Sequence, residues 1–138
     1  MSLREPSKRV HVAVGVVINA DRQILIALRP THVHQGGLWE FPGGKVEQGE
    51  TVQQALRREL KEELAIEARA FKPLLDLQHD YVDKSVRLDV WWVEGFEGQP
   101  VGQEGQAVRW VHSDQLSQYQ FPEANQAIVD AIINRSES

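Results

Sequence analysis

The sequence predicts an α+β fold in which helices cover a mixed β-sheet. Segments rich in valine, isoleucine and tryptophan are typical of strands and make up much of the chain. Only two segments have helical periodicity, and they lie far apart in the sequence. Strands and helices therefore do not alternate, which argues against a repeating βαβ fold. A length of 138 residues is usual for one domain, so we expect residues 1–138 to form a single domain.

The chain is expected to begin with a β-hairpin. Residues 10–19 are rich in valine and should form a strand, and residues 23–29 should pair with it across a turn at 20–22. After a polar loop, residues 38–41 should form a short strand that ends at the Pro-Gly-Gly of 42–44.

Residues 50–64 have the strongest helical pattern in the chain. Val52, Leu56, Leu60 and Leu64 recur at every fourth position and form one apolar stripe. Charged side chains occupy the remaining faces, so this helix is expected to pack one face against the sheet.

The second half of the chain is expected to consist mostly of strands. Residues 66–83 carry mixed strand signals, and residues 83–85 should form a hairpin turn. Residues 86–96 alternate at first and become apolar throughout at 91–93, which indicates a central strand buried on both faces. The remaining predicted elements are a loop at 97–106, a strand at 107–112 and a second helix at 122–134.

Composition and charge exclude several classes of protein. A net charge of −5 disfavours a nucleic acid polymer as a partner. The absence of cysteine excludes disulfides, thiolate zinc sites and a cysteine nucleophile. No apolar run approaches the roughly 20 residues that cross a membrane, and no signal peptide is recognisable. We therefore expect a cytoplasmic monomer with no membrane partner and with disorder only at residues 1–8 and 135–138.

Three glutamates of the first predicted helix lie on one face. Glu59, Glu62 and Glu63 have i, i+3 and i+4 spacing, and like charges this close repel one another. A hard divalent cation would make the arrangement favourable, because Mg²⁺ prefers carboxylates, water and substrate phosphates. On this triplet alone, a solvated face with Arg58 and Lys61 as neighbours is the commoner explanation.

A longer motif surrounds these glutamates. Residues 44–66 read GKVEQGETVQQALRRELKEELAI, which resembles the signature of the Nudix hydrolase family at fixed spacing. The matching positions are Gly44, Glu50, Arg58, Glu59, Leu60, Glu62, Glu63 and Ile66. Ala65 departs from the signature, which has glycine there. Glycine after a helix commonly takes a left-handed conformation, so alanine would cost about 1 kcal/mol if the backbone is kept.

The resemblance implies a metal site. The atoms that it assigns to a divalent ion, Mg²⁺ or alternatively Mn²⁺, belong to Glu59, Glu62, Glu63 and the backbone carbonyl of Gly43. Arg58 is expected to orient the carboxylates, because a guanidinium can bridge two of them. Glu50 is expected to brace the preceding loop.

Further segments resemble the MutT-type members of the family. These are LWEFPGGK at 38–45, WVEGFEGQPVGQEGQ at 92–106 and FPEANQA at 121–127, in an order that is consistent from about residue 10 to 133. The resemblance implies a Nudix-type α/β/α sandwich with a central mixed β-sheet. It also implies Mg²⁺-dependent conversion of a nucleoside triphosphate, 8-oxo-dGTP above all, to the monophosphate and pyrophosphate.

The same resemblance places further residues by position. The residues expected to bind substrate are Arg29, His34, Glu40, Phe41, Pro42, Gly43 and Asn125. Glu104 would be an additional metal ligand or base supplied by the loop. Simpler explanations remain open: Glu104 as a solvated charge, Arg29 as a surface charge, and Asn125 as a helix N-cap. His32 and His34 suggest a transition-metal pair only weakly, because no third ligand is evident.

The mechanism implied by the resemblance is in-line attack of water on the β-phosphorus. Glu59 is our first choice for the residue that positions or deprotonates this water, and Glu104 is the second. Two other functions stay open. One is a Nudix pyrophosphatase for another substrate, such as a pyrimidine triphosphate. The other is a Nudix-fold module that binds a nucleotide without turnover, although such modules usually lose the signature glutamates.

Overall fold

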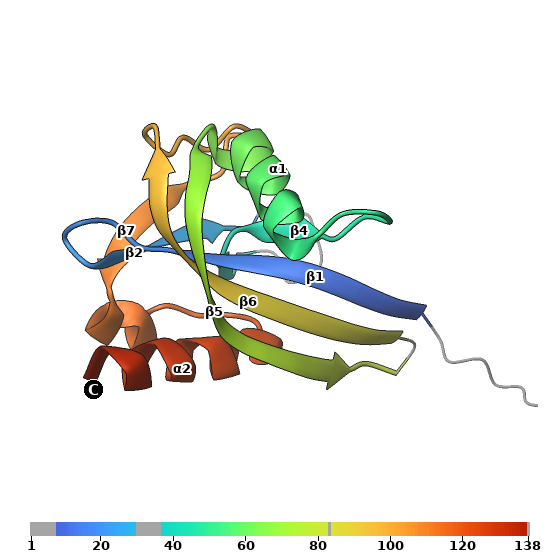
Figure 1. Cartoon of the computed structure of the whole chain (residues 1–138). Helices are drawn as coiled ribbons and strands as arrows, with labels where there is room; N and C mark the ends of the chain where they lie inside the picture. Colours follow the sequence, from blue (N-terminus) through green and yellow to red (C-terminus); the bar gives the residue numbers. More distant parts are fainter. Residues whose placement is uncertain (1–7, 30–36, 83, 138) are drawn as a thin grey trace, which may run out of the picture.

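The computed structural model describes residues 8–29, 37–82 and 84–137. Helix α1 (Val52–Leu64) lies on one side of a twisted sheet, and helix α2 (Gln126–Glu137) lies on the other (Figure 1). This is the α/β/α sandwich that the sequence predicted. The expected disorder at 1–8 and 135–138 is partly wrong, because β1 begins at Lys8 and α2 continues to Glu137. Residues 1–7 and 138 lie outside the described residues.

The larger sheet is mixed, as predicted. Its strand order is β4-β1-β6-β5. The strands are β1 (Lys8–Val17), β4 (Gly43–Lys45), β5 (Glu67–Asp80) and β6 (Lys84–Glu97). β1 is parallel to β6, and the other two pairings are antiparallel. The Gly-Gly of 43–44, expected to end a strand, instead lies in β4 and pairs with β1.

The predicted hairpin of the first two strands is correct only at its turn, where the Arg22 N–H donates to the Asn19 carbonyl at 3.0 Å and the Asn19 N–H donates to the Gln23 carbonyl at 3.1 Å. β2 (Gln23–Leu28) belongs to a separate antiparallel sheet, between β3 (Trp39–Glu40) and β7 (Val108–His112). Beyond this turn, these two described segments share one isolated bridge, Ile18 to Ile24, and no ladder. β6 pairs along all of β1 and β4 pairs with residues 12–14 on its other edge, whereas β2 finds its partners in β3 and β7.

Helix α1 has a well-defined start and a packed face. Thr51 is its N-cap, because the Thr51 hydroxyl accepts the Gln54 N–H at 3.1 Å while the Gln54 side chain accepts the Thr51 N–H at 2.8 Å. The helix therefore begins two residues later than expected. Its buried stripe of Ala55, Leu56, Leu60 and Leu64 packs on the sheet, where Gly15 of β1 leaves room for Leu56 and Leu60.

The hairpin of β5 and β6 is long, and its turn comes earlier than predicted. The Tyr81 N–H donates to the Lys84 carbonyl at 2.7 Å, and β6 begins at Lys84. β6 lies between β1 and β5 and buries Trp92 and Val93, so it is the central strand that the sequence predicted.

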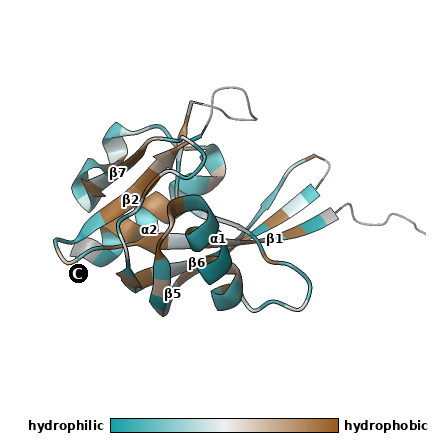
Figure 2. Ribbon diagram, turned by 90° about the horizontal axis from the view of Figure 1, so that it is seen from above, coloured by the Kyte–Doolittle hydropathy of each residue, from teal (hydrophilic) through white to brown (hydrophobic). Residues whose placement is uncertain are grey.

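The C-terminal part covers the other face of the sheet. Two short 3-10 helices, η1 (Ser113–Gln118) and η2 (Glu123–Asn125), precede α2. The predicted helix at 122–134 therefore starts as η2, and η1 was not predicted. Ile128 and Ile132 of α2 are fully buried against the core, and Figure 2 shows hydrophobic residues concentrated in the middle of the molecule, where the helices and strands overlap in this view. Within the described segments, no helix is long and apolar enough to cross a membrane.

Candidate active site

A cavity of about 250 Å³ lies beside the four-stranded sheet. Its lining comprises Val12, Ala13, Val14, Arg29, Glu40, Phe41, Gly43, Gly44, Tyr81, Val86, Leu88, Pro122, Ala124 and Asn125. The structure thus brings together, around one cavity, most of the residues expected to bind substrate: Arg29, Glu40, Phe41, Gly43 and Asn125. Pro42 instead accepts the Gly15 N–H at 2.8 Å through its carbonyl. His34 lies outside the described residues.

Three contacts fix the shape of this cavity. Phe41 is buried, and its ring stacks on Phe121 with centroids 5.0 Å apart, so this wall is rigid. Arg29 Nη1 donates to Glu40 Oε1 at 2.7 Å, which orients these two lining side chains. The Asn125 N–H donates to the Pro122 carbonyl at 2.8 Å, which anchors the backbone of Asn125 at the cavity.

The β5–β6 hairpin supplies lining residues that the sequence analysis missed. Tyr81, Val86 and Leu88 reach the cavity because the long hairpin curves beside β1. No local motif marks them, since their approach depends on the twist of two 14-residue strands.

The two glycines before the signature allow close packing at the site. A Cβ atom at Gly43 would collide with the carbonyl oxygen of Ala13, so β4 could not approach β1. A Cβ atom at Gly44 would collide with the carboxyl group of Glu59. The Glu59 carboxyl therefore lies directly over the backbone of β4, next to the cavity wall.

Arg58 forms a compact ion-pair network with its neighbours. Its Nε and Nη2 donate to the two Glu50 oxygens at 2.8 and 2.9 Å, and its Nη1 donates to Glu59 Oε2 at 3.0 Å. Nη2 also reaches the Lys45 carbonyl at 3.0 Å, and Glu50 Oε1 accepts the Glu47 N–H at 2.9 Å. The Arg58 hydrogen bonds lower the pKa of Glu50 to about 2. Arg58 thus bridges two carboxylates, and Glu50 ties down the preceding loop.

Glu63 has the opposite electrostatic surroundings. Burial is the largest cause that raises its pKa to about 9, followed by a hydrogen bond with the Glu59 carboxyl and repulsion from Glu59, Glu40 and Glu104. Negative charge is therefore costly at Glu63 without a cation. The repulsion also indicates that Glu40 and Glu104, one from β3 and one from a distant loop, lie near the carboxylates of α1.

Glu62 is not part of this cluster in the structure. Its side chain is 64% exposed, and its Oε1 lies 3.9 Å from Arg58 Nη1. Across residues 8–29, 37–82 and 84–137, no three His, Asp or Glu side chains are already gathered as a metal site would gather them. A metal ion held by Glu62 and Glu63 together would therefore require the Glu62 side chain to turn.

The donor set fits a hard divalent cation. Glu59 and Glu63 offer carboxylate oxygens, with Glu40 and Glu104 near them, and hard cations prefer such ligands. Two positive charges would offset the repulsion that raises the pKa of Glu63. A thiolate site is excluded, because the chain has no cysteine.

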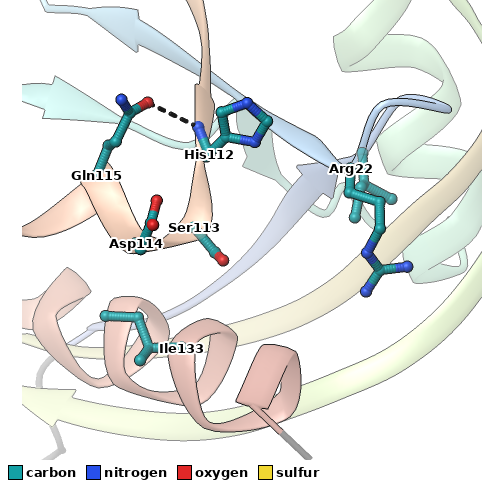
Figure 3. Close-up of a pocket in the computed structure, with 7 residues that line it drawn as sticks. Arg22, His112, Ser113, Asp114, Gln115 and Ile133 are labelled. Carbon is teal, nitrogen blue, oxygen red and sulfur yellow. Dashed lines mark hydrogen bonds between the residues drawn. The ribbon is translucent and has the colours of Figure 1, made fainter.

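A second cavity, shown in Figure 3, lies away from these residues. It has a volume of about 470 Å³ and is lined by Ile18, Arg22, His112, Ser113, Asp114, Gln115 and Ile133. None of the expected site residues lines it. It lies past the end of β1, whereas Val12, Ala13 and Val14 of the same strand line the first cavity.

The fold and the carboxylate helix define a class of metal-assisted phosphoanhydride hydrolases. A family model described as the NUDIX domain matches residues 13–131. The chain therefore belongs to the Nudix hydrolase family, as the signature at 44–66 indicated. Hydrolases of this family generally need a divalent metal ion.

Two relatives from Escherichia coli K12 have the same percentage identity to the chain. The 8-oxo-dGTP diphosphatase is 38% identical over 122 residues, which cover 88% of this chain and 95% of the relative. The CTP pyrophosphohydrolase is 38% identical over 120 residues, which cover 87% and 89%.

Solved structures of the family agree with the fold. A MutT structure from work on Aliivibrio salmonicida and Vibrio cholerae has a TM-score of 0.81 and 43% identity, covering 93% of this chain and 99% of its own. The ORF135 protein of E. coli has a TM-score of 0.83 and 36% identity, covering 93% and 91%.

Proposed function

We propose that this chain hydrolyses 8-oxo-dGTP to 8-oxo-dGMP and pyrophosphate with Mg²⁺, acting as a cytoplasmic monomer that cleans the nucleotide pool. The main support for this proposal is that one cavity is lined by Arg29, Glu40, Phe41, Gly43 and Asn125. The Glu59 carboxyl lies against Gly44, which lines this cavity. The Glu63 carboxyl is close enough to Glu40, another lining residue, to be repelled by it. A relative with the name 8-oxo-dGTP diphosphatase, 38% identical over most of its length, supports this substrate.

The proposed division of roles follows from the arrangement of the site. The cavity takes the base and sugar, and the carboxylate cluster faces the polyphosphate. Glu59, Glu62, Glu63, Glu104 and the carbonyl of Gly43 would hold Mg²⁺, which supplies charge neutralisation of the phosphates and a Lewis acid. Glu59, fixed by Arg58 at 3.0 Å, orients the attacking water, with Glu104 as the second candidate.

Asn125 is proposed to select the oxidised base. Guanine presents two acceptors, N7 and O6, on its Hoogsteen edge. Oxidation at C8 places a hydrogen on N7, so the edge becomes one donor beside one acceptor. The Asn125 amide offers the complementary acceptor and donor, and it lines the cavity. Ordinary guanine would face the amide oxygen with a lone pair.

A pyrimidine triphosphate is the second candidate substrate. The specific observation in its favour is that the CTP pyrophosphohydrolase of E. coli matches this chain at 38% identity, as the 8-oxo-dGTP diphosphatase does. The signature residues do not separate the two, because they act on the phosphates common to both nucleotides.

The test measures pyrophosphate release from 8-oxo-dGTP, dGTP and CTP, with Mg²⁺ and with EDTA. We expect a strong preference for 8-oxo-dGTP in kcat/KM and no turnover in EDTA. A buried mispaired polar group costs about 1–3 kcal/mol, so Asn125→Ala should reduce the preference over dGTP by roughly 5- to 150-fold. It should change kcat for dGTP much less. Equal kcat/KM for the two guanine nucleotides, or an unchanged ratio in the variant, would leave CTP as the first candidate.

A further inference from the structure

The loop that carries Glu104 is attached to the C-terminal end of α1. The Val101 N–H donates to the Leu64 carbonyl at 2.9 Å, and the Gln103 N–H donates to the Glu63 carbonyl at 2.9 Å. The last carbonyls of a helix have no partner within the helix. Here the loop supplies those partners, so it takes its position from the same helix that carries the glutamates.

The side chain of Gln106 makes a further connection between this loop and the helix. Gln106 Oε1 accepts the Glu104 N–H at 2.9 Å, and Gln106 Nε2 donates to the Glu63 carbonyl at 3.3 Å. A single half-buried amide therefore connects the backbones of two glutamates that are 41 residues apart, 63 and 104. The amide of asparagine or glutamine offers a donor and an acceptor on one planar group, and glutamine is the longer of the two.

The turn around Glu104 is built against Gln106. A Cβ atom at Gly102 would collide with the Gln106 carbonyl oxygen, and the Gly105 N–H closes the turn on the Gly102 carbonyl at 3.0 Å. Glu104 lies in this turn with an exposed side chain. The backbone position from which its carboxylate extends is therefore set by the Gln106 contacts.

We propose that Gln106 is a positioning residue that fixes Glu104 relative to Glu63. The inference rests on the proposed function, in which both glutamates serve the metal and the attacking water. Without the Gln106 amide, the Glu104 N–H loses its acceptor and the turn gains freedom. Glu104 would then meet the site in many positions, and misplacement of about 1 Å can cost roughly 100-fold in rate.

The first measurement is amide hydrogen exchange at Glu104 in Gln106→Met, which keeps the length of the side chain and removes both hydrogen bonds. We expect exchange at Glu104 to be about tenfold faster than in the parent, because the N–H loses its acceptor. Unchanged exchange would overturn the proposal. This readout does not depend on which nucleotide is the substrate, so a failure of the proposed function is distinguishable.

The second measurement is a double-mutant cycle on kcat, run with any triphosphate that the protein hydrolyses. If Gln106 acts through Glu104, Gln106→Met should lower kcat by roughly tenfold or more in the parent. In the Glu104→Ala background it should change kcat by less than about twofold. Effects that multiply would show that Gln106 acts by another route and would overturn the proposal.

The matched control is Gln103→Met, in the same loop. Gln103 contacts Glu63 through its backbone N–H, and its side chain makes no hydrogen bond to the described part of the chain. The Gln103→Met variant should keep the parent values of kcat and of amide exchange at Glu104. If Gln106→Met unfolds, Gln106→Asn replaces it, since the shorter amide cannot span both contacts. Parent-like exchange and kcat in Gln106→Asn would equally overturn the proposal.

Discussion

Glu50 and Glu63 are glutamates of the same signature, and their carboxyl groups have opposite surroundings. Glu50 accepts two hydrogen bonds from Arg58, which lower its pKa to about 2. The Glu63 carboxyl is largely buried and lies near other carboxylates, and both factors raise its pKa, to about 9. In the described part of the chain, no arginine or lysine forms an ion pair with Glu63.

This difference assigns separate roles to the two glutamates: Glu50 supports the structure of the signature, and Glu63 is available to bind a cation. Arg58 neutralises Glu50 within the protein, so this pair is complete without a ligand. The negative charge of Glu63 becomes favourable only when positive charge arrives from outside. A helix that repels its own carboxylates in this way has no evident structural benefit, which agrees with a metal-binding role.

The largest expected effect comes from neutralising the uncompensated carboxylate. Glu63→Gln should lower kcat by about 10²–10³-fold, because the site acts mainly through electrostatics. The fold should be retained, since the amide cannot carry the repelled charge. The measurements are kcat at saturating Mg²⁺ and nucleotide, and Tm. Glu67→Gln, on the exposed start of β5, is the control and should keep parent activity. Similar rates for Glu63→Gln and the parent would disprove the metal-site assignment.

The next largest effect should come from Gly44. Gly44→Ala places a methyl group where the Glu59 carboxyl lies, so Glu59 must move away from β4. We expect roughly 10- to 100-fold lower kcat and weaker Mn²⁺ binding by electron paramagnetic resonance. In a Glu59→Ala background the added methyl group has nothing to displace, so it should have little further effect. An equal loss in both backgrounds would mean that Gly44 acts through the backbone instead.

A smaller effect concerns pH and the metal-free protein. Folded, Glu63 keeps its proton up to a pKa of about 9, whereas unfolded it loses the proton near its ordinary pKa of 4.5. Between these values the unfolded state binds fewer protons, so the free energy of unfolding falls as pH rises. This stabilising contribution is complete below 4.5 and is lost as pH rises through 9.

The prediction is that Tm in EDTA falls from pH 5 to pH 9 more steeply for the parent than for Glu63→Gln. For a chain of this size, each kcal/mol lost from the free energy of unfolding lowers Tm by roughly 2–4 °C or somewhat more. Metal affinity should rise over the same range, because a ligand carboxyl must release its proton. Parallel Tm profiles for the two proteins would show that Glu63 is ionised in the folded state.

The features that sequence predicted well depend on short-range spacing. The helix of residues 50–64 was predicted from a repeat of four residues, and its glutamates share a face through i, i+3 and i+4 spacing. The α+β class followed from the order of strands and helices, and the α/β/α sandwich followed from the resemblance to the Nudix family.

The features that sequence did not predict depend on distant segments. β2 was expected beside β1, but β6, from far along the chain, pairs with all of β1, and β4 occupies part of its other edge. Tyr81 reaches the cavity only through the curvature of a long hairpin. Gln106 lies opposite Glu63 because a loop closes the end of α1, and nothing near Gln106 in the sequence indicates this contact.

The smallest expected effect lies at the residue that ends α1. Ala65 has a left-handed backbone, with φ 61° and ψ 30°, and its N–H caps the Lys61 carbonyl at 3.0 Å. Glycine adopts this conformation without the steric cost that alanine bears, so Ala65→Gly should raise the free energy of unfolding by roughly 0.5–1 kcal/mol. Arg22, in the turn after β1, is the other non-glycine residue with positive φ among the described residues, at 63°, and Arg22→Gly should give a similar gain. Urea denaturation measures both variants. Neither should change kcat, because the carboxylates of Glu59 and Glu63 keep their surroundings. A lower midpoint for Ala65→Gly alone would mean that the alanine methyl group makes a stabilising contact at the helix end that outweighs its backbone strain.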